Sequence, residues 1–429
     1  MFRMTALGVS SLRAAFAAGT GKTAWDVVSR SLSFAMSVLV ARELGAAGYG
    51  TFAVYWYTAW MLSQATDLGL HLVSLRSLAS GQNPSVFWSA VAAKGLLTMA
   101  VVLAVAAAVA AGSFSPNLLL VFVLLAAHIM ASWVEFFGVV LRSKGFIARE
   151  GLLLMALRFG WLTAAFWALS RNASLTALAG ALVLAGVPAL GAAMALVRRT
   201  VHVQGSSAAR HETVRLFKES LPLALGTIIT LLYLRADLFI LAALRDANET
   251  GLFQSAFRLF EATFVLSGGI AAGTFPILAS QMGTPRFDVL SRFLLVLLAG
   301  IGGALTCVFA LAGEPIITIL FGQDFRLAAV PLAILGLGLV PVFANALTTH
   351  LLVASGRTRR LVLALGVRLA VGVSLDLVLV PPLGAAGAAI AVTLAEWSLL
   401  GVSLTWVLDL LRRAPLPRHV SREQASSCS

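Results

Sequence analysis

The chain has 429 residues, of which 59% are hydrophobic and only 11% are charged. A soluble fold of this length could not solvate its surface with so few charges. Its apolar runs are continuous, whereas the strands of a membrane β-barrel alternate apolar and polar residues, so a β-barrel is excluded. The composition therefore predicts an all-α polytopic membrane protein. The net charge of +13 would suit a nucleic-acid-binding protein, and the placement of the charges decides whether that reading holds.

Many segments reach the length of about 20 mostly apolar residues that a helix needs to span a bilayer. We expect about twelve transmembrane helices in two six-helix lobes, at 23–43, 48–75, 86–111, 117–141, 151–170, 173–197, 221–243, 249–277, 290–313, 328–354, 361–381 and 385–410. The longest connection is polar and basic and separates six spans from six. It predicts an N-terminal arm (1–22), an N-lobe (23–198), a linker (199–220), a C-lobe (221–411) and a tail (412–429).

Basic residues are distributed very unevenly between the two sides of these spans. Of the 31 Lys and Arg residues, 21 fall in the two tails and in the connections on the same side, four fall on the other side, and six lie inside the spans. Cytoplasmic loops carry such an excess of cations. We therefore expect a multi-pass protein of the bacterial inner membrane with both termini in the cytoplasm. The basic excess reports orientation, and no nucleic-acid partner is expected.

An internal echo suggests that the two halves arose by duplication. Gly50-Thr51-Phe52 recurs as Gly251-Leu252-Phe253 at an offset of 201 residues, and each triplet opens an even-numbered span. Repeats joined through an even number of spans keep the same orientation, so an axis normal to the membrane should relate them. Transporters built in this way place the substrate between the halves.

Six basic residues inside the spans are the main functional signal: Arg30, Lys94, Arg158, Arg235, Arg258 and Arg368. A Lys or Arg at the centre of a lone spanning helix costs roughly 2.5–3.5 kcal/mol, so such residues usually face a polar cavity. Fixed cations in a lumen favour an anionic substrate, and the planar fork of Arg suits phosphate oxygens. Lys94 and Arg158 have no acid at helical spacing on their own helix. We therefore expect these two to be unpaired cavity charges, or to snorkel to the membrane surface.

The other basic residues have acidic neighbours that leave two readings open. Asp26 precedes Arg30 by four residues and Glu261 follows Arg258 by three, so each is either a local ion pair or part of a cavity. Arg235 and Asp237 point to nearly opposite faces of their helix, so at least one should face a partner helix or the cavity. Arg368 and Asp376 share one side of a helix, and either role fits them.

Acidic residues in the same spans are candidates for ion coupling: Asp67, Glu135, Glu261, Asp376 and Glu396. They would bind a proton or Na⁺, or they would only neutralise the arginines. No other cofactor is expected. Polar side chains at helical spacing form stripes on five spans, and a water-accessible lumen would accommodate them together.

Several segments, taken in order, resemble polysaccharide transporters of the multidrug/oligosaccharidyl-lipid/polysaccharide exporter (MOP) superfamily. They are 41–50 (ARELGAAGYG), 67–70 (DLGL), 235–240 (RADLFI), 251–258 (GLFQSAFR), 321–325 (FGQDF) and 382–390 (PLGAAGAAI). The related lipid II flippases share a Ser-Arg-x-x-Gly-Phe element whose arginine is implicated in pyrophosphate recognition. Here residues 29–34 read SRSLSF, which makes Arg30 the equivalent residue. Ser replaces Gly, and those flippases have fourteen spans, which argues against lipid II as the substrate.

The resemblance implies a flippase and not an enzyme. Such a protein would move an undecaprenyl-diphosphate-linked oligosaccharide from the cytoplasmic to the outer leaflet by alternating access of its two lobes. Its partners would be this lipid-linked substrate, the membrane lipids, a polysaccharide polymerase and glycosyltransferases. Two alternatives stay open: a cation-coupled multidrug antiporter of the same superfamily, and an intramembrane acyltransferase that modifies glycans.

Overall fold

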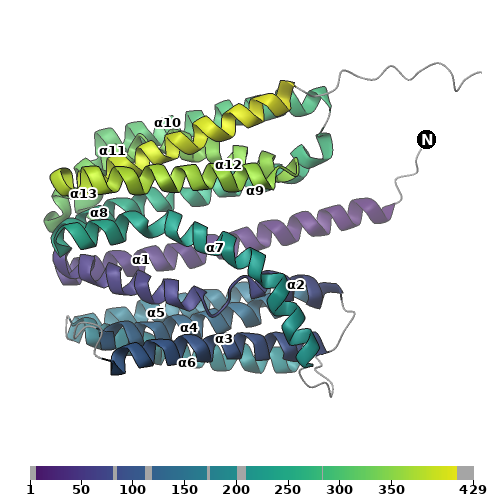
Figure 1. Cartoon of the computed structure of the whole chain (residues 1–429), viewed down its shortest axis with the longest axis horizontal. Coiled ribbons are helices and arrows are strands. Elements are labelled where there is room, and N and C mark those ends of the chain that lie inside the picture. The colour runs from purple at the N-terminus through teal and green to yellow at the C-terminus, as the bar shows by residue number, and fades with distance from the viewer. Residues whose placement is uncertain are drawn as a thin grey trace, which may run out of the picture. The chain divides into compact units, whose positions relative to one another are not determined.

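The computed structural model describes residues 6–80, 85–111, 118–171, 174–200, 209–282 and 284–412, which are almost entirely α-helical (Figure 1). The expected N-terminal arm, linker and C-terminal tail all extend onto residues outside these ranges. Internal contacts divide the chain into two compact units, and each is described by itself. The first comprises residues 1–255 and 316–327, and the second comprises residues 256–315 and 328–429. The predicted lobe boundaries stay a prediction.

The helices follow one another with short connections. The first unit holds α1 (Ala6–Gln64), α2 (Leu70–Ser80), α3 (Ser85–Ala110), α4 (Leu118–Ser143), α5 (Ile147–Arg171), α6 (Leu175–Thr200), α7 (Arg210–Leu244) and the start of α8 (Ala247–Ala262). The second unit holds the rest of α8, then α9 (Phe264–Gln281), most of α10 (Pro285–Phe321), α11 (Ala329–Gly336), α12 (Leu339–Ala354) and α13 (Thr358–Arg412). A 3₁₀ helix, η1 (Gln323–Ala328), follows α10.

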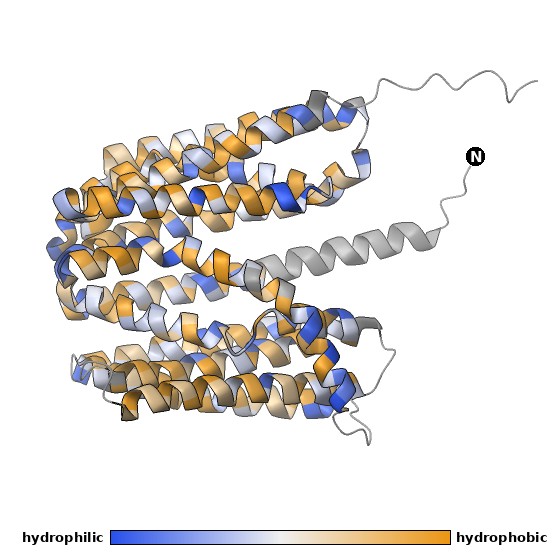
Figure 2. Ribbon diagram, viewed as in Figure 1, coloured by the Kyte–Doolittle hydropathy of each residue, from blue (hydrophilic) through white to orange (hydrophobic). Residues whose placement is uncertain are grey.

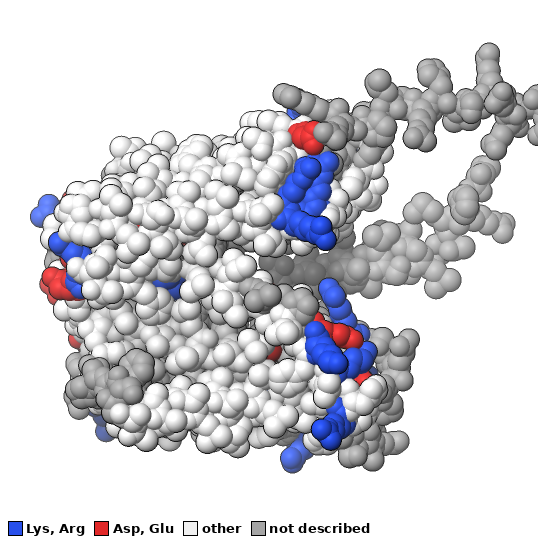
Figure 3. Space-filling model, in the orientation of Figure 1, with Lys and Arg blue, Asp and Glu red and all other residues white. Residues whose placement is uncertain are grey.

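The number of spans agrees with the expected twelve. Among the described residues nine helices are long and apolar enough to cross a membrane, and the bent pair formed by η1–α11 and α12 makes a tenth. Two of these helices, α1 and α13, each merge two helices across a kink and therefore count twice. Figure 2 shows hydrophobic residues over most of the helix length, and Figure 3 shows Lys and Arg gathered mainly near helix ends.

Helices α1 and α13 each turn back on themselves at a glycine. Gly45 has φ 66° and ψ −179°, and Gly384 has φ 55° and ψ −130°, which are conformations that residues with a Cβ rarely adopt. Ser37 and Tyr49 share a 2.5 Å hydrogen bond, although 12 residues of straight helix would separate them by about 18 Å. The halves of α1 therefore lie side by side as a hairpin. In α13 a Cβ on Gly387 would come within 2.2 Å of the Leu379 carbonyl oxygen, which shows the same return.

Two expected spans are broken or bent. Span 48–75 breaks at 65–69 between α1 and α2, and span 328–354 bends by 46° between α11 and α12. Span 249–277 lies within one apolar helical stretch, Ala247–Gln281. At the first break Gly69 has φ 79°, and a Cβ there would lie 2.7 Å from Cβ of Leu223 on α7. Close approach of a neighbouring helix therefore requires glycine at this point.

A helix broken inside a membrane must find partners for the carbonyls that it frees. At the bend between α11 and α12 these partners come from α13. Thr393 Oγ1 donates to the Ile334 carbonyl at 3.0 Å, and Trp397 Nε1 donates to the Leu337 carbonyl at 3.2 Å. Side chains distant in sequence thus stabilise the bend.

The two copies of the internal echo meet at one point in the first unit. A Cβ on Gly50 would lie 1.9 Å from the Ala247 carbonyl oxygen, and a Cβ on Gly251 would lie 1.9 Å from the Ala46 carbonyl oxygen. Both pairs obey the same 201-residue offset, so the contact is reciprocal, as at a local two-fold axis. Helix α1 and helix α8 therefore cross backbone to backbone, which small residues permit.

Candidate substrate-binding site

A polar cavity of about 320 Å³ opens in the first unit between α1, α4 and α5. One face of α1 supplies Asp26, Ser29, Arg30 and Ser33, and the lining is completed by α4 and α5 with Glu135, Leu154 and Arg158. Four of these seven residues carry charge, so the cavity suits a polar or charged group. On the first span the polar side chains at helical spacing are Asp26, Arg30, Ser33 and Ser37. The first three line this cavity, and Ser37 bonds to Tyr49.

Arg158 is paired, and the prediction that it is an unpaired cavity charge is wrong. Its Nη2 lies 3.1 Å from Oε1 of Glu135, and its guanidinium lies over the Trp161 ring at 4.7 Å from the centroid. Glu135 belongs to α4 and not to the helix of Arg158. Spacing along a single helix could not reveal this partner.

Arg30, unlike Arg158 in the same cavity, has no acidic partner among the described residues. Its side chain is exposed, and within the described part of the chain it forms no ion pair or hydrogen bond. The local pair with Asp26, one of the two readings that the spacing allowed, does not form. Arg30 is thus a guanidinium in a polar cavity whose donors are available to a ligand.

Lys94 lies elsewhere in the first unit and is fully buried. Its Nζ lies 3.2 Å from Oδ1 of Asp67 and 2.8 Å from Oγ of Ser132. The other oxygen of Asp67 lies 2.5 Å from Nδ1 of His71. The prediction of an unpaired Lys94 is therefore also wrong, because its partner sits at the break between α1 and α2.

Arg235 and Asp237 on α7 are both buried, each with 4% of its surface exposed. The guanidinium of Arg235 lies 3.9 Å from the centroid of the Tyr57 ring on α1, so it faces a partner helix as expected. Gln254 of α8 donates to the Tyr57 hydroxyl at 3.2 Å. Tyr57 is a contact residue that the sequence analysis missed. The signal in the sequence that could have pointed to Tyr57 is the rarity of tyrosine, since the chain has only four.

In the second unit the predicted site residues form ion pairs. Arg258 Nη1 lies 2.9 Å from Oε2 of Glu261, which confirms the local-pair reading. Arg368 Nη2 lies 3.0 Å from Oε1 of Glu396, and both side chains are almost fully buried. Asn345 donates to the other Glu396 oxygen at 3.1 Å.

The acids proposed for ion coupling therefore mostly neutralise cations. Asp67, Glu135, Glu261 and Glu396 each contact a basic residue, while Asp376 is completely buried. Among the described residues no group of three or more His, Cys, Asp or Glu side chains is arranged to hold a metal ion.

The architecture matches solved membrane transporters. A lipid II flippase MurJ in an inward closed conformation shares 14% identity over 92% of this chain and 89% of that chain, with a TM-score of 0.71. An inward-facing multidrug resistance MATE family transporter of the MOP superfamily shares 16% identity over 90% and 95%, with a TM-score of 0.72. A MOP superfamily transporter from Pyrococcus furiosus shares 15% identity over 92% and 96%, with a TM-score of 0.65. These matches define the class of protein: a multi-pass membrane protein with the fold of MOP superfamily transporters.

Family models narrow this class. The model of the polysaccharide biosynthesis protein family matches residues 22–282, more than half of the chain. The chain belongs to this family. A MatE model matches residues 222–378. No curated protein matches the chain by sequence.

Proposed function

We propose that the protein is a flippase that moves an undecaprenyl-diphosphate-linked oligosaccharide from the cytoplasmic to the outer leaflet for cell-surface polysaccharide biosynthesis. Membership of the polysaccharide biosynthesis family and the fold shared with a lipid II flippase support this. The single observation that carries the proposal is Arg30, an exposed guanidinium in a polar cavity with no ion-pair partner among the described residues.

Arg30 would bind the diphosphate. A guanidinium donates two parallel hydrogen bonds to phosphate oxygens, and a pair of this kind is stronger than one between neutral groups. In the same cavity the charge of Arg158 is offset by Glu135, so Arg158 would orient the substrate more than attract it. Ser29 and Ser33 add hydroxyl groups within the same lining, which suits sugar or phosphate oxygens.

Transport would proceed by alternating access and would be coupled to H⁺ or Na⁺. Asp67 is the most suitable coupling residue in the first unit, because protonation of its carboxylate would change its contacts with both Lys94 and His71. The protein would lie in a bacterial inner membrane with both termini in the cytoplasm. A polymerase and glycosyltransferases would act on the same glycan.

Replacing Arg30 with Ala tests the proposal. Losing a charge-assisted contact worth about 1.5–3 kcal/mol should lower export roughly 10–100-fold. Arg30→Lys should retain part of the export, because it keeps the charge and loses the fork. Export is measured as surface polysaccharide restored in a strain that lacks the protein, and the amount of folded membrane protein is measured in parallel.

Arg171→Ala is the matched control. Arg171 ends α5 and stacks on Trp167, 4.9 Å from its centroid, outside the polar cavity. This variant should export normally. Normal export by Arg30→Ala would contradict the proposal.

The MatE match over 222–378 favours one alternative, a cation-coupled multidrug antiporter. Such a transporter would be expected to move organic cations against a proton or sodium gradient. Drug-dependent dissipation of a gradient by purified protein in vesicles, without movement of a lipid-linked glycan, would favour this alternative over the flippase.

A further inference from the structure

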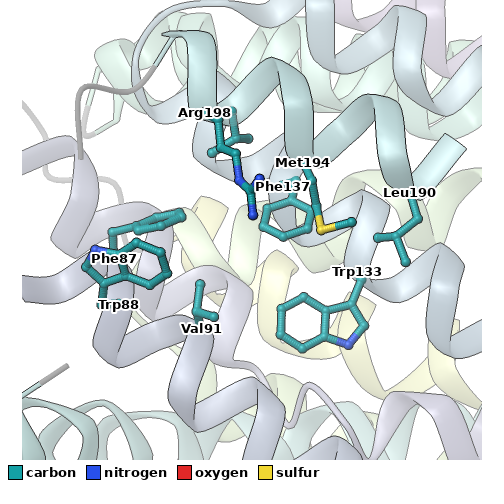
Figure 4. A pocket seen from close by; sticks show the side chains of 9 residues that line it. Phe87, Trp88, Val91, Trp133, Phe137, Leu190, Met194 and Arg198 are labelled. Carbon is teal, nitrogen blue, oxygen red and sulfur yellow. The ribbon is translucent and has the colours of Figure 1, made fainter. Parts of the chain in front are cut away.

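A second cavity, of about 530 Å³, lies in the first unit between α3, α4 and α6, and unlike the polar cavity it is lined mainly by apolar side chains (Figure 4). Eight of its nine lining residues are apolar: Phe87, Trp88, Val91, Trp133, Phe137, Leu190, Met194 and Val197. The ninth is Arg198. The volume falls within the range of roughly 300–1,000 Å³ that is typical of small-molecule sites.

The cavity opens away from the core of the unit. Trp88 keeps 40% of its surface exposed and Met194 keeps 38%, although both line the cavity. In a membrane this opening would meet lipid, so an apolar chain from the bilayer can enter without crossing water. Burial of CH₂ groups is clearly favourable when the alternative is water and much less so when it is lipid. The apolar walls alone would therefore hold a chain only weakly.

Arg198 supplies the selectivity that the walls lack. Figure 4 shows its guanidinium beside the ring of Phe137, with the rings of Phe87 and Trp88 on the opposite side in this view. Within the described residues it forms no ion pair. A cation at one end of an apolar cavity is complementary to a molecule with a long apolar chain and a phosphate at its head.

The start of α7 lies beside α3 close to Trp88. Ala209 donates its backbone N–H to Oγ of Ser89 at 3.1 Å, and Arg210 follows directly. Cations near a membrane surface attract anionic head groups.

We infer that this cavity is a binding site for an anionic glycerophospholipid, with an acyl chain along the aromatic walls and the phosphate at Arg198. The inference goes beyond the proposed function, because the site shares no residue with the polar cavity around Arg30. It would hold a resident membrane lipid and not the transported substrate.

The test is native mass spectrometry of the full-length protein, purified in detergent and titrated with phosphatidylglycerol or phosphatidylcholine. Wild-type protein should bind the first phosphatidylglycerol molecule roughly fivefold more tightly than phosphatidylcholine. Arg198→Gln should remove this preference. Arg199→Gln, which removes the same charge one residue away from the cavity lining, should keep most of it.

A second pair of variants tests the apolar walls. Val91→Phe fills the cavity and should weaken binding of the first lipid several-fold. Val187→Phe, on an exposed part of α6 outside the cavity, should not. Equal losses in Arg198→Gln and Arg199→Gln would overturn the inference, as would equal affinity for the two lipids. Displacement of phosphatidylglycerol by a lower concentration of undecaprenyl phosphate would also overturn it, by showing a site for the substrate lipid.

Discussion

Lys94 shows how this protein accommodates charge inside a membrane. The side chain is fully buried, yet its ammonium contacts a carboxylate, a hydroxyl and the faces of two aromatic rings, at 5.6 Å from the Trp133 centroid and 5.7 Å from the Phe136 centroid. These contacts replace the water that a buried cation loses. The same residue type without them would be expelled toward the membrane surface.

Breaking this pair should destabilise the protein strongly. Lys94→Met leaves Asp67 without its buried cation, and removing one partner of a buried pair costs about 3 kcal/mol or more. We expect the thermal unfolding midpoint in detergent to fall by several degrees. The double variant Lys94→Met with Asp67→Asn should recover part of this loss, because it removes both charges together.

Lys144→Ala is the control for this experiment, because Lys144 is exposed in the turn between α4 and α5. It should leave the unfolding midpoint within the scatter of the wild type. A double variant no more stable than Lys94→Met alone would show that the two charges do not depend on each other.

At the scale of helices, the crossing of α1 and α8 is the most demanding contact in the first unit. Two backbones approach so closely that neither Gly50 nor Gly251 has room for a single methyl group. The reciprocal geometry explains why both copies of the internal echo keep glycine at the same position. A contact of this kind relies on close packing of backbone atoms and on Cα–H···O interactions, not on side chains.

Gly251→Ala should therefore sharply reduce the yield of monodisperse protein, and Gly50→Ala should do the same. The added methyl group would lie 1.9 Å from a backbone oxygen in each case, so the helices must separate. Gly191→Ala on α6 is the control, since no atom lies within 4 Å of its added Cβ. Alanine in an open helix position is favoured by about 0.5–1 kcal/mol. Wild-type yield from Gly251→Ala would refute the close crossing.

At the scale of the whole chain, charge placement and helix count support one topology. In the proposed topology the short connections alternate sides, and the basic ones would lie on the side of both termini. With the bent pair counted as one span and the hairpins at Gly45 and Gly384 as two spans each, the count is even. An even count is required if the two ends of the chain face the same compartment.

Cysteine labelling tests this topology. In a background with Cys307 and Cys428 replaced by Ser, Lys144→Cys should react with a membrane-impermeant maleimide only after the cells are permeabilised. Asn248→Cys, exposed at the start of α8, should react in intact cells. The reverse pattern would invert the proposed orientation, and labelling of both in intact cells would refute the predicted number of crossings between them.

Composition and local pattern were sufficient for the class and the number of spans, and the resemblance of six ordered segments implied the fold family. Apolar length alone marks a spanning helix, because no soluble structure hides so much apolar surface. Gly45 and Gly384, where the structure turns back, lie in the gaps between the expected spans, at 44–47 and 382–384. The interruption at 65–69 was not predicted, because the hydropathy of 48–75 is continuous and the break depends on α7 lying against Gly69.

The sequence by itself determined which side chains carry charge inside the membrane, and only the tertiary structure decided which of those charges are neutralised. Spacing along one helix detects pairs such as Arg258 with Glu261, because both partners lie on one face. The partners of Lys94, Arg158 and Arg368 come from segments 27, 23 and 28 residues away. Packing brings these segments together, and electrostatic energy depends on distance in space, so no reading along the chain could separate the paired cations from Arg30.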